Sequence, residues 1–274
     1  MALAVKFQNG NRKNPNVQVF EKKDAGFVIG KCNDRTLNPN DVENPLWQIA
    51  DTLCKFNCPV YFMQGWARDS YVRFRDTYFA RDISYLKGNP ISVCEGGFCI
   101  DNGKVALVLV PEMNLLFSKV KEDLAMLKTR FLDGMEFVLL PYQALRGKHI
   151  DLYASLFGST LLVDNYYLHL TPQILSDLAR HGINVRLFWS VSFEFNIPIF
   201  EIDGRKIALI HERTTDNTRN SLKLEGICPY EVDFGLVPRS LRLENLGGGI
   251  RCATNWIDNP DILDFFGITY ERIF

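Results

Sequence analysis

The sequence predicts an α/β protein that folds as one closed domain built from repeated units. Three observations lead to this prediction. One turn pattern recurs five times along the chain, strand-like apolar runs follow these turns, and helical patterns precede them. The 274 residues include 47% hydrophobic and 23% charged side chains, which is enough for a large core and excludes disordered and fibrous classes.

The repeated turn places a residue that tolerates a left-handed backbone just beyond a helical pattern. Glycine lacks the Cβ atom that opposes a positive φ, and asparagine is the next most tolerant residue. The five positions are Asn57, Gly134, Gly182, Gly226 and Gly267. The glycines follow one another at intervals of 48, 44 and 41 residues, whereas Asn57 precedes the first of them by 77 residues. We therefore expect an insertion in the first interval.

Helices are predicted before three of these turns. Residues 118–132 carry apolar side chains at helical spacing. Residues 171–180 begin with Thr followed by Pro, and residues 259–266 begin with Asn followed by Pro, which are start signals for helices. Further strands are predicted after other glycine-containing turns, at residues 104–110, 159–165 and 205–211.

The divergent interiors of the units favour a closed domain over an open array. An open array would repeat a consensus sequence in each unit, whereas here only the turns agree. No Gly-x-Gly-x-x-Gly sequence follows a predicted strand, so the fingerprint of a dinucleotide-binding fold is missing. We expect one domain over residues 1–274, with its functional site at the centre.

The charge balance argues against a nucleic-acid partner, and the short apolar runs argue against a membrane. Lys and Arg number 31 against 32 Asp and Glu, and no block of like charge stands out. The longest apolar run, residues 105–110, is far shorter than the roughly 20 residues needed to cross a bilayer. Polar residues follow so soon after the first seven that we expect no signal peptide.

The seven cysteines predict reduced thiols in a cytoplasmic protein. Their number is odd, and their spacing does not resemble a disulfide framework. Cys54 with Cys58, and Cys94 with Cys99, lack a matching pair of Cys or His residues that would complete a zinc site. We therefore expect no metal and no other cofactor.

Four segments combine special backbone chemistry with ionisable side chains: Trp-Ala-Arg-Asp at residues 66–69, Glu-Gly-Gly at 95–97, His-Ile-Asp at 149–151, and Gly-Gly-Gly-Ile-Arg-Cys at 247–252. Alone, each also fits an ordinary role, as a surface turn with an Arg–Asp pair, a turn into a strand, a hydrogen-bonded pair, or a small buried side chain. On a strand, the His and the Asp would point to the same face. The glycine run is the strongest signal, because it permits close backbone approach and a thiol directly after it is poorly suited to core filling.

Taken in order, these segments resemble the guanidine-modifying enzymes of the pentein fold, which include agmatine, arginine and peptidylarginine deiminases, dimethylarginine hydrolases and amidinotransferases. Residues 66–69 resemble the Trp-x-Arg-Asp of agmatine deiminases, and residues 95–97 resemble the Glu-Gly-Gly of arginine deiminases. Residues 147–151 are similar to Gly-His-hydrophobic-Asp with one residue inserted, and residues 248–255 resemble the terminal Gly-Gly-x-x-Cys motif. The resemblance implies a closed five-bladed α/β propeller of ββαβ units around a central active site.

The resemblance also implies a role for each candidate residue. Cys252 would attack the guanidinium carbon, and His149 would protonate the departing amine and then activate water. Glu95 would orient His149 and stabilise its charge. Asp69 and Asp151 would hold the guanidinium, which is planar and permanently charged and is therefore suited to paired carboxylates. A thiol has a pKa of about 8.5 and needs a cationic neighbour to ionise at neutral pH, and the substrate or the histidine would supply that charge.

Two further residues are expected at the substrate site, and departures from the family leave the substrate open. Trp66 is one of the two. The other, Arg251, stands where many relatives carry His, and it fits recognition of a substrate carboxylate or phosphate, a lowering of the thiol pKa, or a solvated strand residue. Phe98 follows Glu-Gly-Gly where arginine deiminases usually have Asp, and Lys148 is inserted in the Gly-His motif.

These residues predict a cysteine-dependent hydrolase, a deiminase, that converts an arginine-like group to a citrulline-type product and ammonia through a covalent thiouronium intermediate. The partner would be a small-molecule or peptidyl guanidine, and free arginine, a small derivative and peptidyl-arginine remain open. An arginine dihydrolase and an amidinotransferase are alternatives with related chemistry. A non-catalytic pentein binding protein is the alternative outside catalysis, but it would not need the Cys, His and Glu set.

Overall fold

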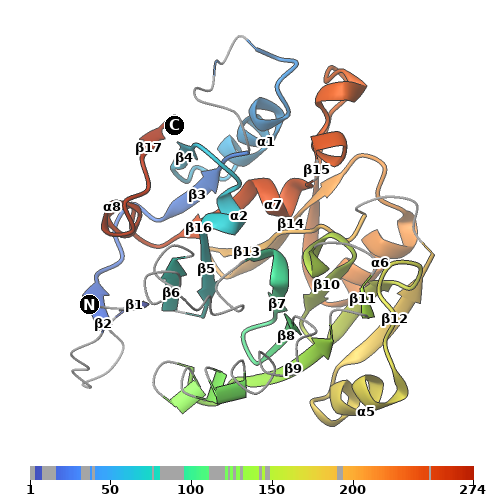
Figure 1. The fold of residues 1–274 in the computed structure, drawn as a ribbon. Helices are drawn as coiled ribbons and strands as arrows, with labels where there is room; N and C mark the ends of the chain where they lie inside the picture. Colours follow the sequence, from blue (N-terminus) through green and yellow to red (C-terminus); the bar gives the residue numbers. More distant parts are fainter. Residues whose placement is uncertain are drawn as a thin grey trace. The chain divides into compact units, whose positions relative to one another are not determined.

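The computed structural model describes residues 4–7, 17–31, 38, 41–75, 77–80, 96–110, 121–122, 124–125, 128–129, 132–141, 144–145, 149–189, 194–246 and 248–274 (Figure 1). The chain divides into two compact units, each made of two chain segments. Unit 1 comprises Met1–Phe20 and Asp69–Ser190, and unit 2 comprises Glu21–Arg68 and Val191–Phe274. Within the described residues, no helix has the length and apolar character needed to span a membrane.

The described residues of unit 1 form three sheets. The first has the order β2-β1-β6-β5, with β1 (Ala4–Phe7), β2 (Val17–Phe20), β5 (Tyr71–Phe74) and β6 (Thr77–Ala80). The second has the order β7-β8-β9, with β7 (Cys99–Asp101), β8 (Val105–Val110) and β9 (Glu136–Pro141). The third has the order β10-β11-β12, with β10 (Ala154–Phe157), β11 (Thr160–Asp164) and β12 (Asn184–Phe188).

The described residues of unit 2 form two sheets. One has the order β16-β3-β4-β17, with β3 (Gly26–Ile29), β4 (Val60–Met63), β16 (Thr254–Ile257) and β17 (Tyr270–Arg272). The other has the order β13-β14-β15, with β13 (Ile199–Ile202), β14 (Arg205–His211) and β15 (Ile227–Val232). Helices α1 (Pro45–Cys54), α6 (Asp216–Leu224) and α8 (Asp261–Phe265) are among those that accompany them.

Three of the sheets follow the same chain path. In β7-β8-β9, β10-β11-β12 and β13-β14-β15, the first two strands are antiparallel and the third is parallel to the second. A parallel pair needs a crossover connection, which helix α5 (Pro172–Arg180) supplies after β11 and helix α6 supplies after β14. The start of α5 confirms the sequence signal, because the Thr171 side chain accepts a hydrogen bond from the Ile174 N–H and Pro172 is the first helical residue.

All five predicted turns have the expected backbone. The φ angles are positive at Asn57 (52°), Gly134 (71°), Gly182 (73°), Gly226 (71°) and Gly267 (72°). The strands predicted after other glycine turns are also present as β8, β11 and β14. The predicted helix at residues 118–132 lies only partly within the described residues.

The expectation that the five turns mark five separate units is wrong. The turn at Asn57 leads into β4 and the turn at Gly267 leads into β17, and these two strands are neighbours in one sheet. The sheet β2-β1-β6-β5 contains none of the five turns. A left-handed residue reports only that the chain reverses after a helix, and it does not determine which strand the next segment will pair with.

Side chains at the turns connect neighbouring sheets of unit 1. The guanidinium of Arg75, in the turn between β5 and β6, donates to the carbonyl oxygens of Gly103 (2.5 Å), Asp133 (2.7 Å) and Gly134 (3.2 Å). The side chain of Asn102, between β7 and β8, donates to the Gly158 carbonyl (2.6 Å) between β10 and β11. These bonds satisfy turn carbonyls that lie outside the ladders.

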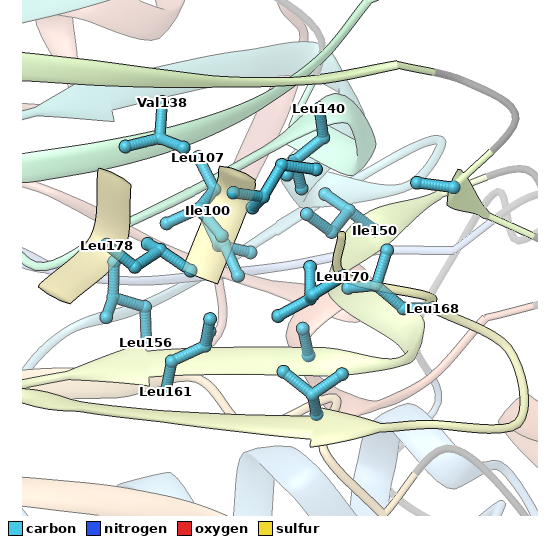
Figure 2. Close-up of a cluster of buried hydrophobic side chains, with 14 of the residues drawn as sticks. Ile100, Leu107, Val138, Leu140, Ile150, Leu156, Leu161, Leu168, Leu170 and Leu178 are labelled. Carbon is cyan, nitrogen blue, oxygen red and sulfur yellow. The ribbon is translucent and has the colours of Figure 1, made fainter. Parts of the chain in front are cut away.

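Each unit has its own hydrophobic core. In unit 1, β7-β8-β9 packs against β10-β11-β12 and α5, and Figure 2 shows Leu107 and Val138 of one sheet directed toward Leu156 and Leu161 of the other. In unit 2, the core surrounds Phe27 of β3, whose ring contacts Phe200 and Trp256 edge-on with centroids 5.0 Å away in each case.

We expect Gly226→Ala to lower the free energy of unfolding by about 1 kcal/mol, because a Cβ atom opposes the φ of +71°. No atom lies within 4 Å of the position of that Cβ, so the loss comes from the backbone alone. Urea denaturation measures it. Gly226→Asn is the matched control and should lose less, since Asn57 already adopts a φ of 52°. An alanine variant as stable as the wild type would contradict this explanation of the turn.

Candidate functional site

Two loops of unit 2 meet at the end of strand β3. This strand pairs in parallel with β4 on one side and antiparallel with β16 on the other. The one-turn helix α2 (Ala67–Ser70) follows β4, and the one-turn helix α7 (Ile250–Ala253) directly precedes β16. Beyond β3, the Gly30 N–H donates to the Ala253 carbonyl (2.9 Å), and the Gly30 carbonyl accepts from the Ala67 N–H (3.4 Å). Trp66 and Cys252, far apart in sequence, are therefore held at the same end of one sheet.

The glycine run before Cys252 is explained by close contacts. A Cβ atom on Gly249 would lie 2.4 Å from the Asn196 Oδ1 atom, and a Cβ atom on Gly248 would lie 2.6 Å from the Trp66 ring. The backbone of Gly249 is extended, with φ −147° and ψ −169°, so it is space rather than dihedral freedom that requires glycine there. The expected close approach is confirmed for these two glycines, and Gly247 lies outside the described residues.

Asn196 is the residue at this site that the sequence analysis missed. Its Oδ1 atom accepts hydrogen bonds from the backbone N–H groups of Arg251 (2.7 Å) and Cys252 (3.3 Å), and its Nδ2 atom donates to the Cys252 Sγ atom (3.3 Å). The only signal in the sequence was a single amide between apolar Phe195 and Ile197. All three residues are almost fully buried, and a buried polar side chain in such a run indicates a specific partner.

Cys252 is itself buried, with 3% of its surface exposed. Unlike a core-filling thiol, its sulfur contacts an amide donor and its backbone lies in a short helix fixed by the same side chain. Arg251, on the neighbouring position of α7, is half-buried and helical. The interpretation of Arg251 as a solvated strand residue is therefore wrong, because β16 begins only at Thr254.

Unit 1 contains the His and Asp candidates. His149 has an extended backbone, but residues Ile150–Leu152 form a 3-10 turn, η4, so the strand assumed for this pair is not present. Ile150 is fully buried in the core shown in Figure 2, and it anchors the turn. Asp151 is also fully buried, whereas His149 is half-buried. In this dry setting a carboxylate attracts a cation more strongly than it would in water.

The glycines of the Glu-Gly-Gly segment have a comparable explanation. Gly96–Phe98 forms a 3-10 turn, η2, and a Cβ atom on Gly97 would lie 2.3 Å from both Cγ and Nδ1 of His149. The Phe98 ring stands edge-on to the same imidazole, with ring centroids 5.6 Å apart. The structure thus brings this segment and His149 together within unit 1. Glu95 lies outside the described residues.

The Trp-Ala-Arg-Asp segment is not the surface turn of its ordinary interpretation. Residues 67–70 form α2, and Arg68 is only 6% exposed. Trp66 is half-buried with its ring against Gly248, and Asp69 is half-buried at the first position of the second chain segment of unit 1. Some of the predicted segments therefore meet within each unit. Trp66 contacts the Cys252 loop in unit 2, and Gly97 lies against His149, two residues before Asp151, in unit 1.

Two other thiols, those of Cys54 and Cys58, have a raised pKa. Burial raises the pKa of the Cys54 thiol, and the nearby Asp51 carboxylate raises it further. Burial likewise raises the pKa of the Cys58 thiol, with a smaller contribution from Asp203. Both are therefore protonated and weakly nucleophilic at neutral pH.

No protein-family model and no curated protein sequence matches the chain. Several solved structures do match it. Dimethylarginine dimethylaminohydrolase from Pseudomonas aeruginosa, a cysteine-to-serine variant in complex with citrulline, has 12% identity and a TM-score of 0.54 over 85% of this chain and 98% of its own. The N-terminal domain of ArgZ, covalently bound to a reaction intermediate, has 13% identity and a TM-score of 0.54 over 85% and 97%. ArgZ is an arginine dihydrolase from cyanobacteria.

These similarities show the fold. The chain shares the α/β fold of these two enzymes, and the enzymes that its ordered motifs resemble are of this kind. The aligned part covers 85% of the chain and nearly the whole of each related structure. The chain therefore shares its architecture with each of them, and the similarity is not confined to a local motif.

We expect Gly97→Ala to displace the His149 ring, because the new Cβ atom would overlap it. In NMR spectra, the ring resonances of His149 should shift while those of the other three histidines keep their positions. Gly103→Ala is the control, since it strains a turn with φ +80° but places its Cβ atom in open space. Unchanged His149 resonances in a folded Gly97→Ala variant would refute the contact.

Proposed function

We propose that this protein is a cysteine-dependent hydrolase that acts on the guanidinium group of arginine or an arginine derivative and releases ammonia and a citrulline-type product. Cys252 is the nucleophile, His149 the acid and base, and Asp69 and Asp151 the ligands of the guanidinium. Glu95 orients His149. The observation that carries the proposal is the Cys252 loop, in which an amide contacts the sulfur and the adjoining backbone approaches too closely for any residue but glycine.

The arrangement around Cys252 suits a nucleophile better than a core residue. The buried sulfur accepts a hydrogen bond from Asn196, and such a bond favours the thiolate, which is the stronger acceptor. The sulfur is also carried by a helix that two glycines bring against Trp66 and Asn196. Trp66, whose ring lies against Gly248, and Arg251, the residue before Cys252, are half-buried and are proposed to contact the substrate.

The surroundings of His149 and Asp151 support their roles. Asp151 is fully buried, and a planar guanidinium can donate two parallel hydrogen bonds to such a carboxylate. His149 is half-buried against the Gly97 backbone and the Phe98 ring, which restrict the orientation of the imidazole. A general acid must present one ring nitrogen in a fixed direction, so this restriction is useful to the reaction.

The proposed reaction has two steps. The Cys252 thiolate attacks the guanidinium carbon and forms a C–S bond, and the C–N bond breaks as His149 donates a proton to the departing ammonia or amine. His149 then takes a proton from water, the hydroxide adds to the same carbon, and the C–S bond breaks to release the ureido product. Dividing the displacement in this way replaces one difficult step with two easier ones.

We further propose that residues 1–274 form one catalytic domain arranged as a closed five-bladed propeller. The chain enters each unit twice, which supports a single folding domain over two independent ones. The five sheets of the described residues supply one sheet for each blade.

Incubation with arginine, agmatine, methylated arginines and an arginine peptide tests the reaction. We expect ammonia or an amine together with a ureido product from at least one of these compounds, and Cys252→Ala should lower the rate by about 10³-fold or more. Ornithine as product would instead indicate a dihydrolase, and dependence on an added amine would indicate an amidinotransferase. Binding without turnover, or unchanged turnover by Cys252→Ala, would refute the proposed hydrolysis.

A haloacetamidine, which carries a guanidine-like cation beside its leaving group, should label Cys252 ahead of the exposed Cys228. Iodoacetamide lacks that cation and should react readily with Cys228. The ratio of Cys252 labelling to Cys228 labelling, compared between the two reagents, therefore measures recognition of the cation. Cys228→Ala is the matched control and should retain labelling at Cys252. Equal ratios with both reagents would contradict a guanidinium site around Cys252.

A further inference from the structure

We propose that Asn196 is a positioning residue that holds Cys252 and favours its thiolate form; this inference rests on the proposed function. No sequence motif pointed to Asn196. The proposal comes from three contacts made by one buried side chain: the backbone N–H groups of Arg251 and Cys252 donate to Oδ1, and Nδ2 donates to the Cys252 sulfur.

The orientation of the amide follows from these contacts. The oxygen and nitrogen of an asparagine side chain must be assigned from their partners. Here two N–H donors face one end of the amide, and only an oxygen can accept from them. The other end is therefore the NH₂ group, which lies 3.3 Å from Sγ and donates to it.

The two ends of the amide have different consequences. The Oδ1 bonds fix the start of α7 and thus the position of the sulfur. The Nδ2 bond acts on the charge of the sulfur, because a donor directed at it favours the anion over the neutral thiol. Since Cys252 is only 3% exposed, water supplies little of the solvation that a thiolate needs, and this donor replaces part of it.

Asn196 is itself held firmly in the fold. Its neighbours Phe195 and Ile197 are each 1% exposed, and its own carbonyl accepts from the Arg251 N–H (3.4 Å). Two residues earlier, the Glu194 Oε1 atom accepts from the N–H (3.0 Å) and the hydroxyl (2.5 Å) of Thr215 and from the hydroxyl of Thr218 (2.6 Å). The start of helix α6 therefore anchors the segment that carries the amide.

The missing side chain of Gly249 completes the arrangement. A Cβ atom there would lie 2.4 Å from Oδ1 and 2.7 Å from Cγ of Asn196, so it would push the amide away from α7. Gly249 thus leaves room for the Asn196 side chain, which comes from a distant segment and contacts the Cys252 sulfur.

Asn196→Asp tests the proposal, because it keeps the shape and one acceptor oxygen but replaces the donor beside sulfur with a second oxygen. The readout is the rate of Cys252 alkylation by iodoacetamide as a function of pH, followed by mass spectrometry of the Cys252 peptide. This reagent needs no guanidine site. We expect the midpoint of the profile to rise by about one pH unit or more, with about tenfold slower alkylation near neutral pH.

Asn259→Asp is the matched control. Asn259 is also buried, accepts from a backbone N–H (Asp261, 2.9 Å) and donates to one acceptor, but that acceptor is the Glu21 carbonyl and not a thiol. In the Asn259→Asp variant, the pH profile of Cys252 alkylation should equal that of the wild type. If Asn196→Asp does not fold, Asn196→Ala decides, since it removes the same donor without adding a charge. Thermal unfolding establishes which variants are folded.

The outcomes separate this inference from the proposed function. A raised alkylation midpoint in a folded Asn196 variant supports the positioning role, whether or not the wild type hydrolyses guanidines. An unchanged midpoint in a folded variant overturns it, even if hydrolysis is observed. A purely structural role would change the unfolding temperature and leave the midpoint of the surviving folded protein in place.

Discussion

Strand β3 and the glycine that follows it determine where the candidate nucleophile lies. The strand bonds to β4 on one side and to β16 on the other, so segments from opposite ends of the sequence become neighbours. Gly30 then contacts two loops. Its carbonyl accepts from the loop that follows β4, and its N–H donates to the loop that precedes β16. A Cβ atom on Gly30 would lie 2.4 Å from the Gly65 carbonyl oxygen and 2.5 Å from that of Met63, so a larger residue would displace the segment at the end of β4. The contact between Gly248 and the Trp66 ring joins the same two loops.

Glycine serves two physically distinct purposes in this protein. At the turns after helices, φ is positive and the space around the missing Cβ is open, so the requirement is conformational. At Gly97, Gly248 and Gly249 the opposite holds: a neighbouring side chain occupies the position that a Cβ atom would take. The first kind stabilises the fold, and the second brings backbone against His149, Trp66 and Asn196. Substitutions of the two kinds should therefore affect different properties, stability in one case and site geometry in the other.

The environment of Cys252 differs from that of the half-buried thiols Cys54 and Cys58. Around Cys54 and Cys58, apolar burial and nearby carboxylates both raise the thiol pKa. Around Cys252, burial is accompanied by an amide donor. What distinguishes Cys252 is a side-chain amide from a distant segment that donates to its sulfur and also binds its backbone N–H.

The sequence alone determined the features that depend on one residue and its immediate neighbours. The left-handed turns at Asn57 and at the four glycines, the capped start of α5 and the order of the motif residues were all readable, because φ preference and capping are local properties. The α/β class followed from the recurring turns and the strand and helix patterns beside them. Only the tertiary structure decided that β17 joins β4, that residues 150–152 form a 3-10 turn, and that Asn196 reaches Cys252. These features depend on contacts between residues far apart in the chain, and no local pattern encodes which distant segment will fill the space that a glycine leaves.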